Sequence, residues 1–306
     1  MKHDTAWRLR AAVAFALVYL IWGSTYAAIR VGVAELPPAL FAGARFVAAG
    51  VLLALYARLR GHKFPRGWRE WRTIAVVGVF MLATANGLVV WGEQWLPSNQ
   101  AALLVATAAL WMAGFGVLGT QGDKLAPRTL AGLAIGFFGA AMLLAPGGAG
   151  FTLDELWAQL AVLASALAWS AGSIYAKRER PTTPPFMSAA MQSLVAGVFL
   201  SGIGFAAGET ARWTWTPTAL WTLAYLTVFG SCLAYAAYIW LLHAVSPAAL
   251  GTYAYVNPAI AVALGWLVLD ESLSGGQLAG MVVILLGVLL VTTARPKAVV
   301  APAQRS

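Results

Sequence analysis

Hydrophobic side chains fill long blocks of the chain, and short breaks rich in proline, glycine and charged residues separate them. Pro37-Pro38 and Gly275-Gly276 are typical breaks. A membrane-spanning helix needs about 20 mostly apolar residues. Ten blocks meet this length, and they predict spans at 11–31, 37–58, 72–92, 98–120, 127–145, 156–176, 186–207, 218–242, 246–269 and 276–294. The pattern therefore predicts an all-α integral membrane protein with ten transmembrane helices.

The two halves of the chain share a sequence pattern. The segment Thr129–Gly139 matches Gln277–Gly287 at Leu, Ala and two Gly positions, about 148 residues apart. Each half holds five predicted spans, so the second half must enter the membrane from the opposite side. We predict two inverted-topology five-helix repeats, 1–148 and 149–296, and a cytoplasmic tail at 297–306. Inverted repeats are typical of secondary transporters, whose substrate site lies between the halves.

Composition supports the membrane assignment, since the chain is 60% hydrophobic and 10% charged, with a mean hydropathy of +0.75. Soluble domains are about 25% charged, so a soluble enzyme, a nucleic-acid binder and a disordered chain are all disfavoured. The net charge of +9 has another source. All lysines and arginines except Arg30, Arg45 and Arg212 fall in segments on one predicted side. By the positive-inside rule, this places both termini in the cytoplasm of a bacterial-type inner membrane. For the Arg58–Arg72 cluster, the alternative to this topological role is binding of lipid.

Several motifs together identify a resemblance. They are Trp22-Gly-Ser-Thr-Tyr26, Asn257-Pro258, Asp270-Glu271-Ser-Leu273 and Leu278-Ala-Gly280 with Gly287. The chain resembles the drug/metabolite transporter superfamily, specifically its ten-span EamA-type exporters, over nearly its whole length. Its aromatic richness is similar to that of the YddG-type exporters of aromatic amino acids. The resemblance implies a transporter with alternating access. The family often has proline in span 4, but this chain has Leu110 there, so a break in that span is not implied.

Aromatic and polar residues near the middle of the spans are candidates for a substrate cavity. Aromatic faces offer stacking and cation–π contacts, and Asn side chains offer both donor and acceptor. We predict a cavity lined mainly by spans 1, 3, 4, 6, 8 and 9, suited to hydrophobic or aromatic amino acids. The alternative is that these side chains only pack between helices. The predicted substrate-binding residues are Trp22, Ser24, Tyr26, Asn86, Trp111, Trp169, Tyr235, Tyr238, Tyr253 and Asn257.

The charged residues inside the spans indicate whether transport is coupled to the movement of protons. Arg45 lies within span 2, where it could reach outward, bind a carbonyl or contact a substrate carboxylate. No acidic residue lies in the middle of a span, and Glu93, at the end of span 3, comes nearest. Proton-coupled carriers usually keep a carboxylate or histidine within the membrane. We therefore expect facilitated diffusion, with proton-coupled export of drugs or metabolites as the alternative.

The sequence contains few features of other functional classes. The single cysteine, Cys232, leaves no CxxC metal site, and no HExxH, GxSxG or Walker A motif is present. We expect no enzyme activity, no catalytic residue, no cofactor and no metal. The alternative classes are a membrane-embedded enzyme, a receptor and a scaffold. The expected partners are a small-molecule substrate and the lipid bilayer, with no nucleic acid, in a monomer or weak homodimer.

Overall fold

The computed structural model describes residues 2–116, 127–144, 152–179, 182–245 and 250–293, and these are helical without any strand. A short 3₁₀ turn, η2 (Glu209–Arg212), lies between two of the helices. The helical segments are α1 (Lys2–Val33); α2 (Pro38–Leu59); α3 (Trp68–Val77), η1 (Gly78–Asn86) and α4 (Gly87–Gly92); α5 (Ser98–Val105) and α6 (Ala108–Gly116); α7 (Pro127–Leu144); α8 (Leu153–Glu179); α9 (Pro185–Ala206); α10 (Pro217–Tyr225), η3 (Leu226–Ala234) and α11 (Tyr235–Ala244); α13 (Tyr253–Leu269); and α14 (Gly275–Thr293).

Hydropathy and length identify membrane-crossing helices among the described residues. Six helices are long and apolar enough to span a bilayer: Ala6–Val33, Pro38–Leu59, Trp68–Gly92, Leu153–Glu179, Pro185–Ala206 and Pro217–Ala244. Val256–Leu269 and Gly275–Val291 are shorter apolar helices. Many large apolar side chains, such as Trp221, Phe138 and Leu278, face outward, as lipid-facing side chains do. The predicted all-α membrane fold is confirmed.

Span 4 departs from the predicted continuous helix, because a turn at Ala106–Thr107 separates α5 from α6. The Thr107 hydroxyl donates to the carbonyl of Leu104, which offers the backbone an alternative to helical hydrogen bonding. A break therefore occurs without the proline that Leu110 replaces. In span 9 the turn falls at Gly251–Thr252, and Pro258 lies inside α13 without ending it.

The ends of some predicted segments lie outside the described residues. These are the end of span 4 at 117–120, the last residue of span 5 at 145, the start of span 9 at 246–249, the last residue of span 10 at 294 and the tail at 297–306.

Corresponding helices of the two halves pack against each other in antiparallel pairs. In the first pair, Gly43 of α2 lies against Ser201 of α9, while Gly50, further along α2, lies against Leu194, nearer the start of α9. The pair α7 and α14 does the same. A Cβ on Gly139 would lie 2.6 Å from the backbone nitrogen of Ile284. Two repeats whose equivalent helices run in opposite directions have inverted topology.

An irregular segment recurs at the same place in both halves. Spans 3 and 8 each contain nine residues of π-helix, η1 and η3, which begin 148 residues apart. π-Helix is rare, and it appears mostly as short stretches inside α-helices at functional sites. Its recurrence at the repeat interval extends the sequence repeat to the backbone.

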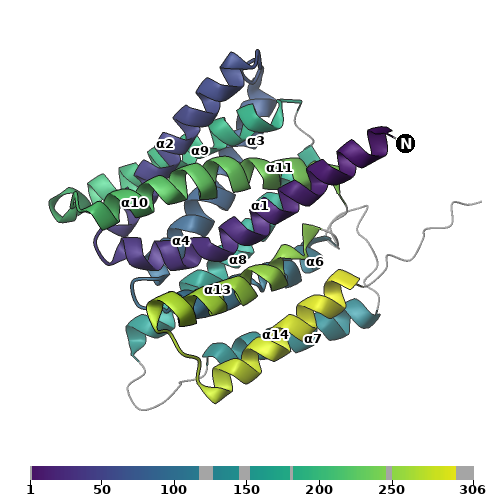
Figure 1. Ribbon diagram of the computed structural model, residues 1–306, viewed down its shortest axis with the longest axis vertical. Helices are drawn as coiled ribbons and strands as arrows, with labels where there is room; N and C mark the ends of the chain where they lie inside the picture. Colours follow the sequence, from purple (N-terminus) through teal and green to yellow (C-terminus); the bar gives the residue numbers. More distant parts are fainter. Residues whose placement is uncertain (1, 117–126, 145–151, 180–181, 246–249, 294–306) are drawn as a thin grey trace, which may run out of the picture.

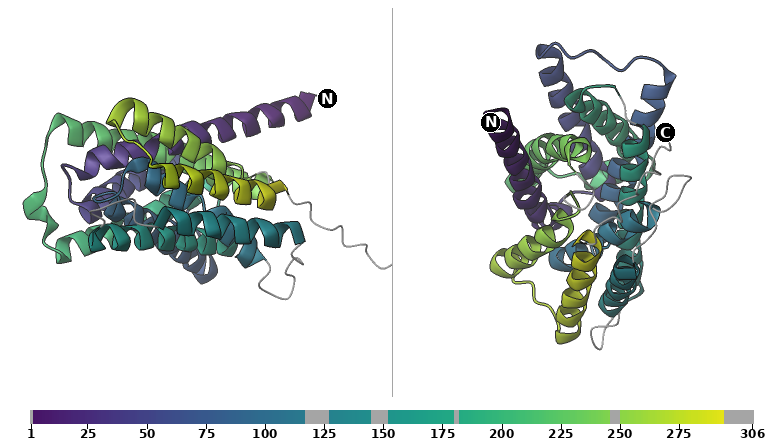
Figure 2. Two further views of the ribbon diagram at one scale, coloured as in Figure 1. Left: turned by 90° about the horizontal axis from the view of Figure 1, so that it is seen from below. Right: turned by 90° about the vertical axis from the view of Figure 1, so that its right-hand side faces the viewer.

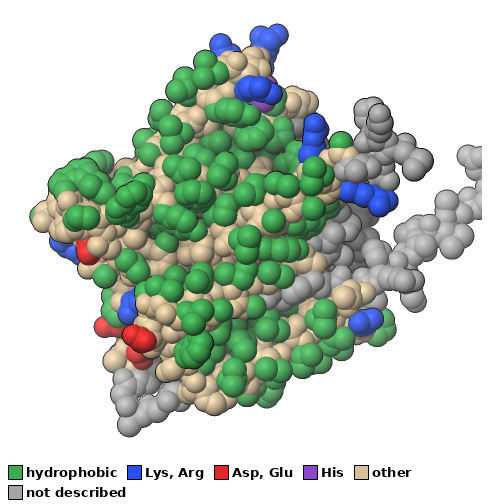
Figure 3. All heavy atoms as spheres, in the orientation of Figure 1, with side chains coloured by type: hydrophobic (Ala, Val, Ile, Leu, Met, Phe, Trp, Pro, Cys, Tyr) green, Lys and Arg blue, Asp and Glu red, His purple; other side chains and the backbone are tan. Residues whose placement is uncertain are grey.

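The helices form one elongated bundle, with α2 and α9 at one edge and α7 and α14 at the other (Figure 1). The first turns of α1 project beyond the neighbouring helices (Figure 2). On the face shown in Figure 3, most basic side chains gather toward the end where α1 begins and around the turn after α2. Acidic side chains lie at the opposite end of that face. The charge asymmetry of the sequence is thus also an asymmetry in space.

Candidate functional site

A cavity lies at the centre of the bundle, where α1, α8 and the two π-helical segments meet α2, α5 and α13. Both π-helices supply part of its wall. Its lining consists of Trp22, Thr25, Tyr26, Ile29, Arg45, Phe46, Leu82, Ala85, Asn86, Val89, Val105, Ser165, Trp169, Gly230, Ser231, Tyr235, Tyr253 and Asn257. The predicted spans 1, 3, 4, 6, 8 and 9 all contribute, and span 2 adds Arg45 and Phe46.

Four aromatic rings from four spans pack together at one side of the cavity, and three of them, Trp22, Trp169 and Tyr253, line it. The ring of Trp22 lies 5.2 Å from that of Trp169, 5.0 Å from that of Tyr238 and 5.9 Å from that of Tyr253. The indole nitrogen of Trp169 donates to the Tyr253 hydroxyl at 3.1 Å. The pairs of Trp22 with Trp169 and with Tyr253 are edge-to-face, and such pairs are worth about 0.5–1.5 kcal/mol beyond their burial, which helps to hold these rings together.

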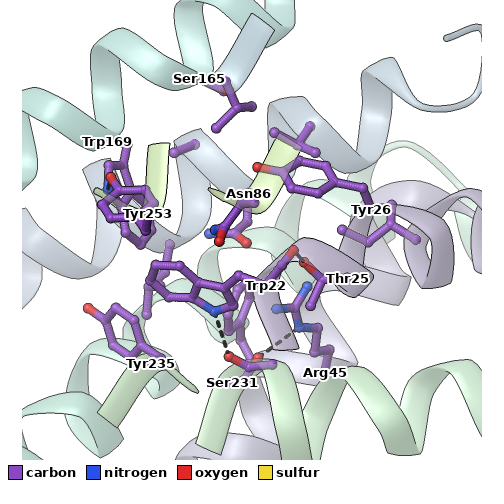
Figure 4. A pocket seen from close by; sticks show the side chains of 18 residues that line it. Trp22, Thr25, Tyr26, Arg45, Asn86, Ser165, Trp169, Ser231, Tyr235 and Tyr253 are labelled. Atoms are coloured by element: carbon purple, nitrogen blue, oxygen red, sulfur yellow. Dashed lines mark hydrogen bonds between the residues drawn. The ribbon is translucent and has the colours of Figure 1, made fainter. Parts of the chain in front are cut away.

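Polar groups lie on the other side (Figure 4). Arg45 Nε donates to Ser231 Oγ at 2.7 Å, and the indole nitrogen of Trp22 donates to the carbonyl of Gly230. Asn86 donates to the carbonyl of Met81, five residues earlier in η1. Arg45 Nη1 and Asn257 Oδ1 are buried without a hydrogen-bond partner among the described residues. The cavity therefore presents one unpaired donor and one unpaired acceptor.

The cavity is contracted in this conformation. Its volume is about 80 Å³, whereas small-molecule pockets hold about 300–1,000 Å³. A few waters or a small polar group would fill it. Admission of a larger substrate therefore requires the surrounding helices to move apart.

The structure brings seven of the ten predicted residues to the cavity wall: Trp22, Tyr26, Asn86, Trp169, Tyr235, Tyr253 and Asn257. The other three lie elsewhere. Ser24 faces Tyr225, and Tyr238 lies behind Trp22 and bonds to Ser173. Trp111 packs against Phe137, because α6 turns its ring toward α7.

Sequence reasoning did not select four further polar residues of the wall: Thr25, Arg45, Ser165 and Ser231. The sequence places Arg45 within span 2 near its end, and this position leaves the direction of its side chain open. Thr25 lies within the Trp22–Tyr26 motif and Ser231 is four residues before Tyr235, so helical spacing was the available signal for both.

Several carboxylates lie at the end of the bundle away from the N-terminus. Asp270 adopts a left-handed conformation (φ 52°) that ends α13, and Glu271 then accepts from the backbone nitrogens of Ser98 and Asn99 and from the Ser98 hydroxyl. Glu209 likewise accepts from the backbone nitrogens of Ala39 and Leu40. Both carboxylates thus stabilise the N-terminus of a helix from another part of the chain.

Glu93 differs from these carboxylates. It is fully buried, and neither carboxylate oxygen has a hydrogen-bond partner in the described part of the chain. Arg30 donates to the main-chain carbonyls of Glu93 and Gln94, and not to the carboxylate. Burial favours the neutral form of such a carboxyl group.

A ten-segment bundle of paired repeats around a central cavity is the architecture of a secondary transporter. The chain belongs to the EamA-like transporter family, which matches residues 9–145 and 156–293. It is 40% identical over 294 residues to the "Uncharacterized inner membrane transporter YedA" of Escherichia coli strain K12, covering 94% of this chain and 93% of that protein.

More distant proteins agree with this family membership. The "Uncharacterized transporter YvbV" of Bacillus subtilis is 27% identical over 286 residues, which cover 94% of this chain and 92% of that protein. A solved crystal structure matches with a TM-score of 0.69 at 21% identity, over 92% of this chain and 96% of that one. That likeness shows the fold alone. The predicted family is confirmed, and the chain is a membrane transporter.

Proposed function

We propose that the protein exports small amphipathic metabolites, with hydrophobic or aromatic amino acids as its substrates, by alternating access. The observation that carries this proposal is the central cavity, in which an aromatic wall lies opposite Arg45 Nη1 and Asn257 Oδ1, and neither atom has a partner among the residues that the structure describes. The rings suit an apolar side chain, and the two polar groups suit a molecule with both an acceptor and a donor. A YddG-like preference for aromatic side chains belongs to this proposal.

The arrangement in the membrane is part of the proposal. The halves 1–148 and 149–296 would rock against each other, opening the contracted cavity to one side at a time. The basic end of the bundle would face the cytoplasm, with both termini on that side of a bacterial-type inner membrane. Reporter fusions after Ser306 and in the turn after Ala206 test this orientation, which fails if the Ser306 fusion reports a periplasmic location. Sizing in detergent tests the expected monomer or weak homodimer.

Uptake of radiolabelled amino acids by the purified protein in liposomes tests the substrate class. We expect phenylalanine, tyrosine and leucine to exchange across the bilayer and charged amino acids not to exchange. Trp22→Ala should lower exchange strongly, since Trp22 contacts three other rings. Trp221→Ala is the matched control, because Trp221 is 76% exposed on the outer face of α10. Equal exchange by both variants would contradict the assignment of the cavity.

We propose that transport is facilitated diffusion, because none of the described residues that line the cavity carries a carboxylate. Proton-coupled export is a second candidate, and Glu93 favours it as a buried carboxyl group without a partner among the described residues. Exchange that ignores an imposed pH gradient would support diffusion. Substrate-driven proton movement that Glu93→Gln abolishes would establish coupling, with Glu209→Gln as the control at the same end of the bundle.

A further inference from the structure

Arg45 brings a positive charge from α2 into the central cavity. Its side chain is only 4% exposed, and its guanidinium carbon lies 4.9 Å from the centre of the Phe46 ring. Nε donates to Ser231 Oγ, while Nη1 has no hydrogen-bond partner in the described part of the chain. Within the described residues, the salt bridges join Glu179 to Arg69 and Arg72, and none includes Arg45. The guanidinium therefore has no carboxylate of the described chain in direct contact.

A buried charge in this position is costly unless an anion or several hydrogen bonds stabilise it. One hydroxyl and one aromatic ring meet only part of that need. The side chain does not reach outward to the membrane surface, since it ends against Ser231 of η3 (Figure 4). Gly230 keeps the adjacent space free, because a Cβ there would lie 3.1 Å from Arg45 Nη2. The site is thus built around a buried guanidinium whose Nη1 has no partner among the described residues.

The other residues of the cavity wall indicate which kind of anion Arg45 would bind. Arg45 is the only charged residue among the described residues of the wall, so the site balances one negative charge. A planar guanidinium matches a carboxylate through two parallel hydrogen bonds. A phosphate ester carries nearly two negative charges, whereas the site offers a single cation beside aromatic rings. One of the two charges of the ester would therefore stay unbalanced. The chemistry therefore favours a monocarboxylate with an apolar body.

We propose that Arg45 binds the carboxylate of the transported molecule, so that the carboxylate is the group the transporter requires. This inference rests on the proposed function and narrows its substrate class. The ammonium group of an amino acid would then find Asn257 Oδ1, the unpaired acceptor of the same cavity. Compounds that keep the carboxylate but lack the ammonium group should still bind, more weakly.

Analogues of one amino acid test the inference on the unaltered protein. In liposomes that exchange radiolabelled phenylalanine, 3-phenylpropanoate should compete, whereas phenylalaninamide and phenethylamine should not. In detergent, phenylalanine and 3-phenylpropanoate should raise the melting temperature of the purified protein, and the amide and amine should leave it unchanged. Competition by the amide or the amine as strong as that by 3-phenylpropanoate would overturn the inference.

Variants locate the effect. Arg45→Gln should lower phenylalanine exchange by about tenfold or more, because a charge-assisted pair is lost, and Arg45→Lys should retain part of it. Arg58→Gln, at the exposed end of the same helix, is the matched control and should exchange at the parent rate. If Arg45→Gln does not fold, the melting temperature of Arg45→Lys is measured with 3-phenylpropanoate and with phenylalaninamide. A weaker stabilisation by 3-phenylpropanoate than in the parent protein supports the inference, and an unchanged stabilisation contradicts it.

The two proposals fail in different ways. If the liposomes take up no amino acid but carboxylates still stabilise the parent protein and not Arg45→Gln, the proposed function is wrong and the carboxylate site stands. If phenylalanine is exchanged and Arg45→Gln exchanges it at the parent rate, the carboxylate site is wrong and the transport function stands.

Discussion

At the end of the bundle away from the N-terminus, here called the rim, the Glu271 carboxylate accepts from two backbone N–H groups and a hydroxyl, and where paired helices pack together, glycines let their backbones touch. At the centre, Arg45 Nη1 and Asn257 Oδ1 are buried without partners among the described residues. The cost of burial is offset within the protein itself at Glu271, whereas at Arg45 and Asn257 part of that cost is not offset by the described residues. The difference separates groups that hold the fold from groups that are free to bind a ligand.

Gly197→Val should give the largest loss of stability. A Cβ on Gly197 would lie 2.5 Å from the backbone nitrogen of Val47, which cannot move aside as a side chain can. Overpacking of this kind costs about 1–3 kcal/mol and occasionally more, so we expect little folded protein. Gly202→Val, on the same helix with no atom within 4 Å, is the control. Similar folded yields and melting temperatures in detergent would contradict close packing of α2 and α9.

Glu271→Ala should give the next largest loss. The substitution leaves the backbone nitrogens of Ser98 and Asn99 without their acceptor and removes a negative charge from the start of α5. Losses of helix caps cost about 0.5–2 kcal/mol. The melting temperature should fall, while Asp154→Ala, an exposed carboxylate in the first turn of α8, should change it little. An unchanged melting temperature for Glu271→Ala would remove the distinction between rim and centre.

Asn257→Leu should raise the stability of the protein, in contrast to the two preceding substitutions. It replaces a buried acceptor that has no partner among the described residues, and removal of such a group saves about 1–3 kcal/mol of desolvation penalty. We expect the melting temperature to rise slightly while amino acid exchange is lost. Asn99→Leu, whose side-chain oxygen is also unpaired but lies outside the cavity lining, is the comparison for exchange. A destabilised Asn257→Leu would show that Asn257 holds the fold.

Glu179→Gln should have the smallest effect. Its carboxylate pairs with Arg69 and Arg72, whose side chains are 76% and 48% exposed. Exposed ion pairs contribute about 0–1 kcal/mol, and salt screens them. The melting temperature should barely change at low salt and should not change at high salt. A large loss would mean that this end of the bundle depends on charge pairing.

Much of this fold could be predicted from the sequence, because lipid imposes long apolar helices and the charge bias orders them. The break at Ala106–Thr107 could not, since no proline or glycine marks it. Of the candidate site, the residues on one helical stripe, such as Trp22 and Tyr26, do line the cavity. The ring of Trp111 turns toward Phe137, and depth along a helix says nothing of that direction. The Arg45–Ser231 contact joins two spans, so spacing within either one could not reveal it.

The matching π-helices bear on how the protein arose. An irregular backbone at the same register in both halves indicates that η1 and η3 descend from one segment of a shorter ancestor. Because η1 and η3 both line the cavity, each half supplies an irregular wall of the same kind to it.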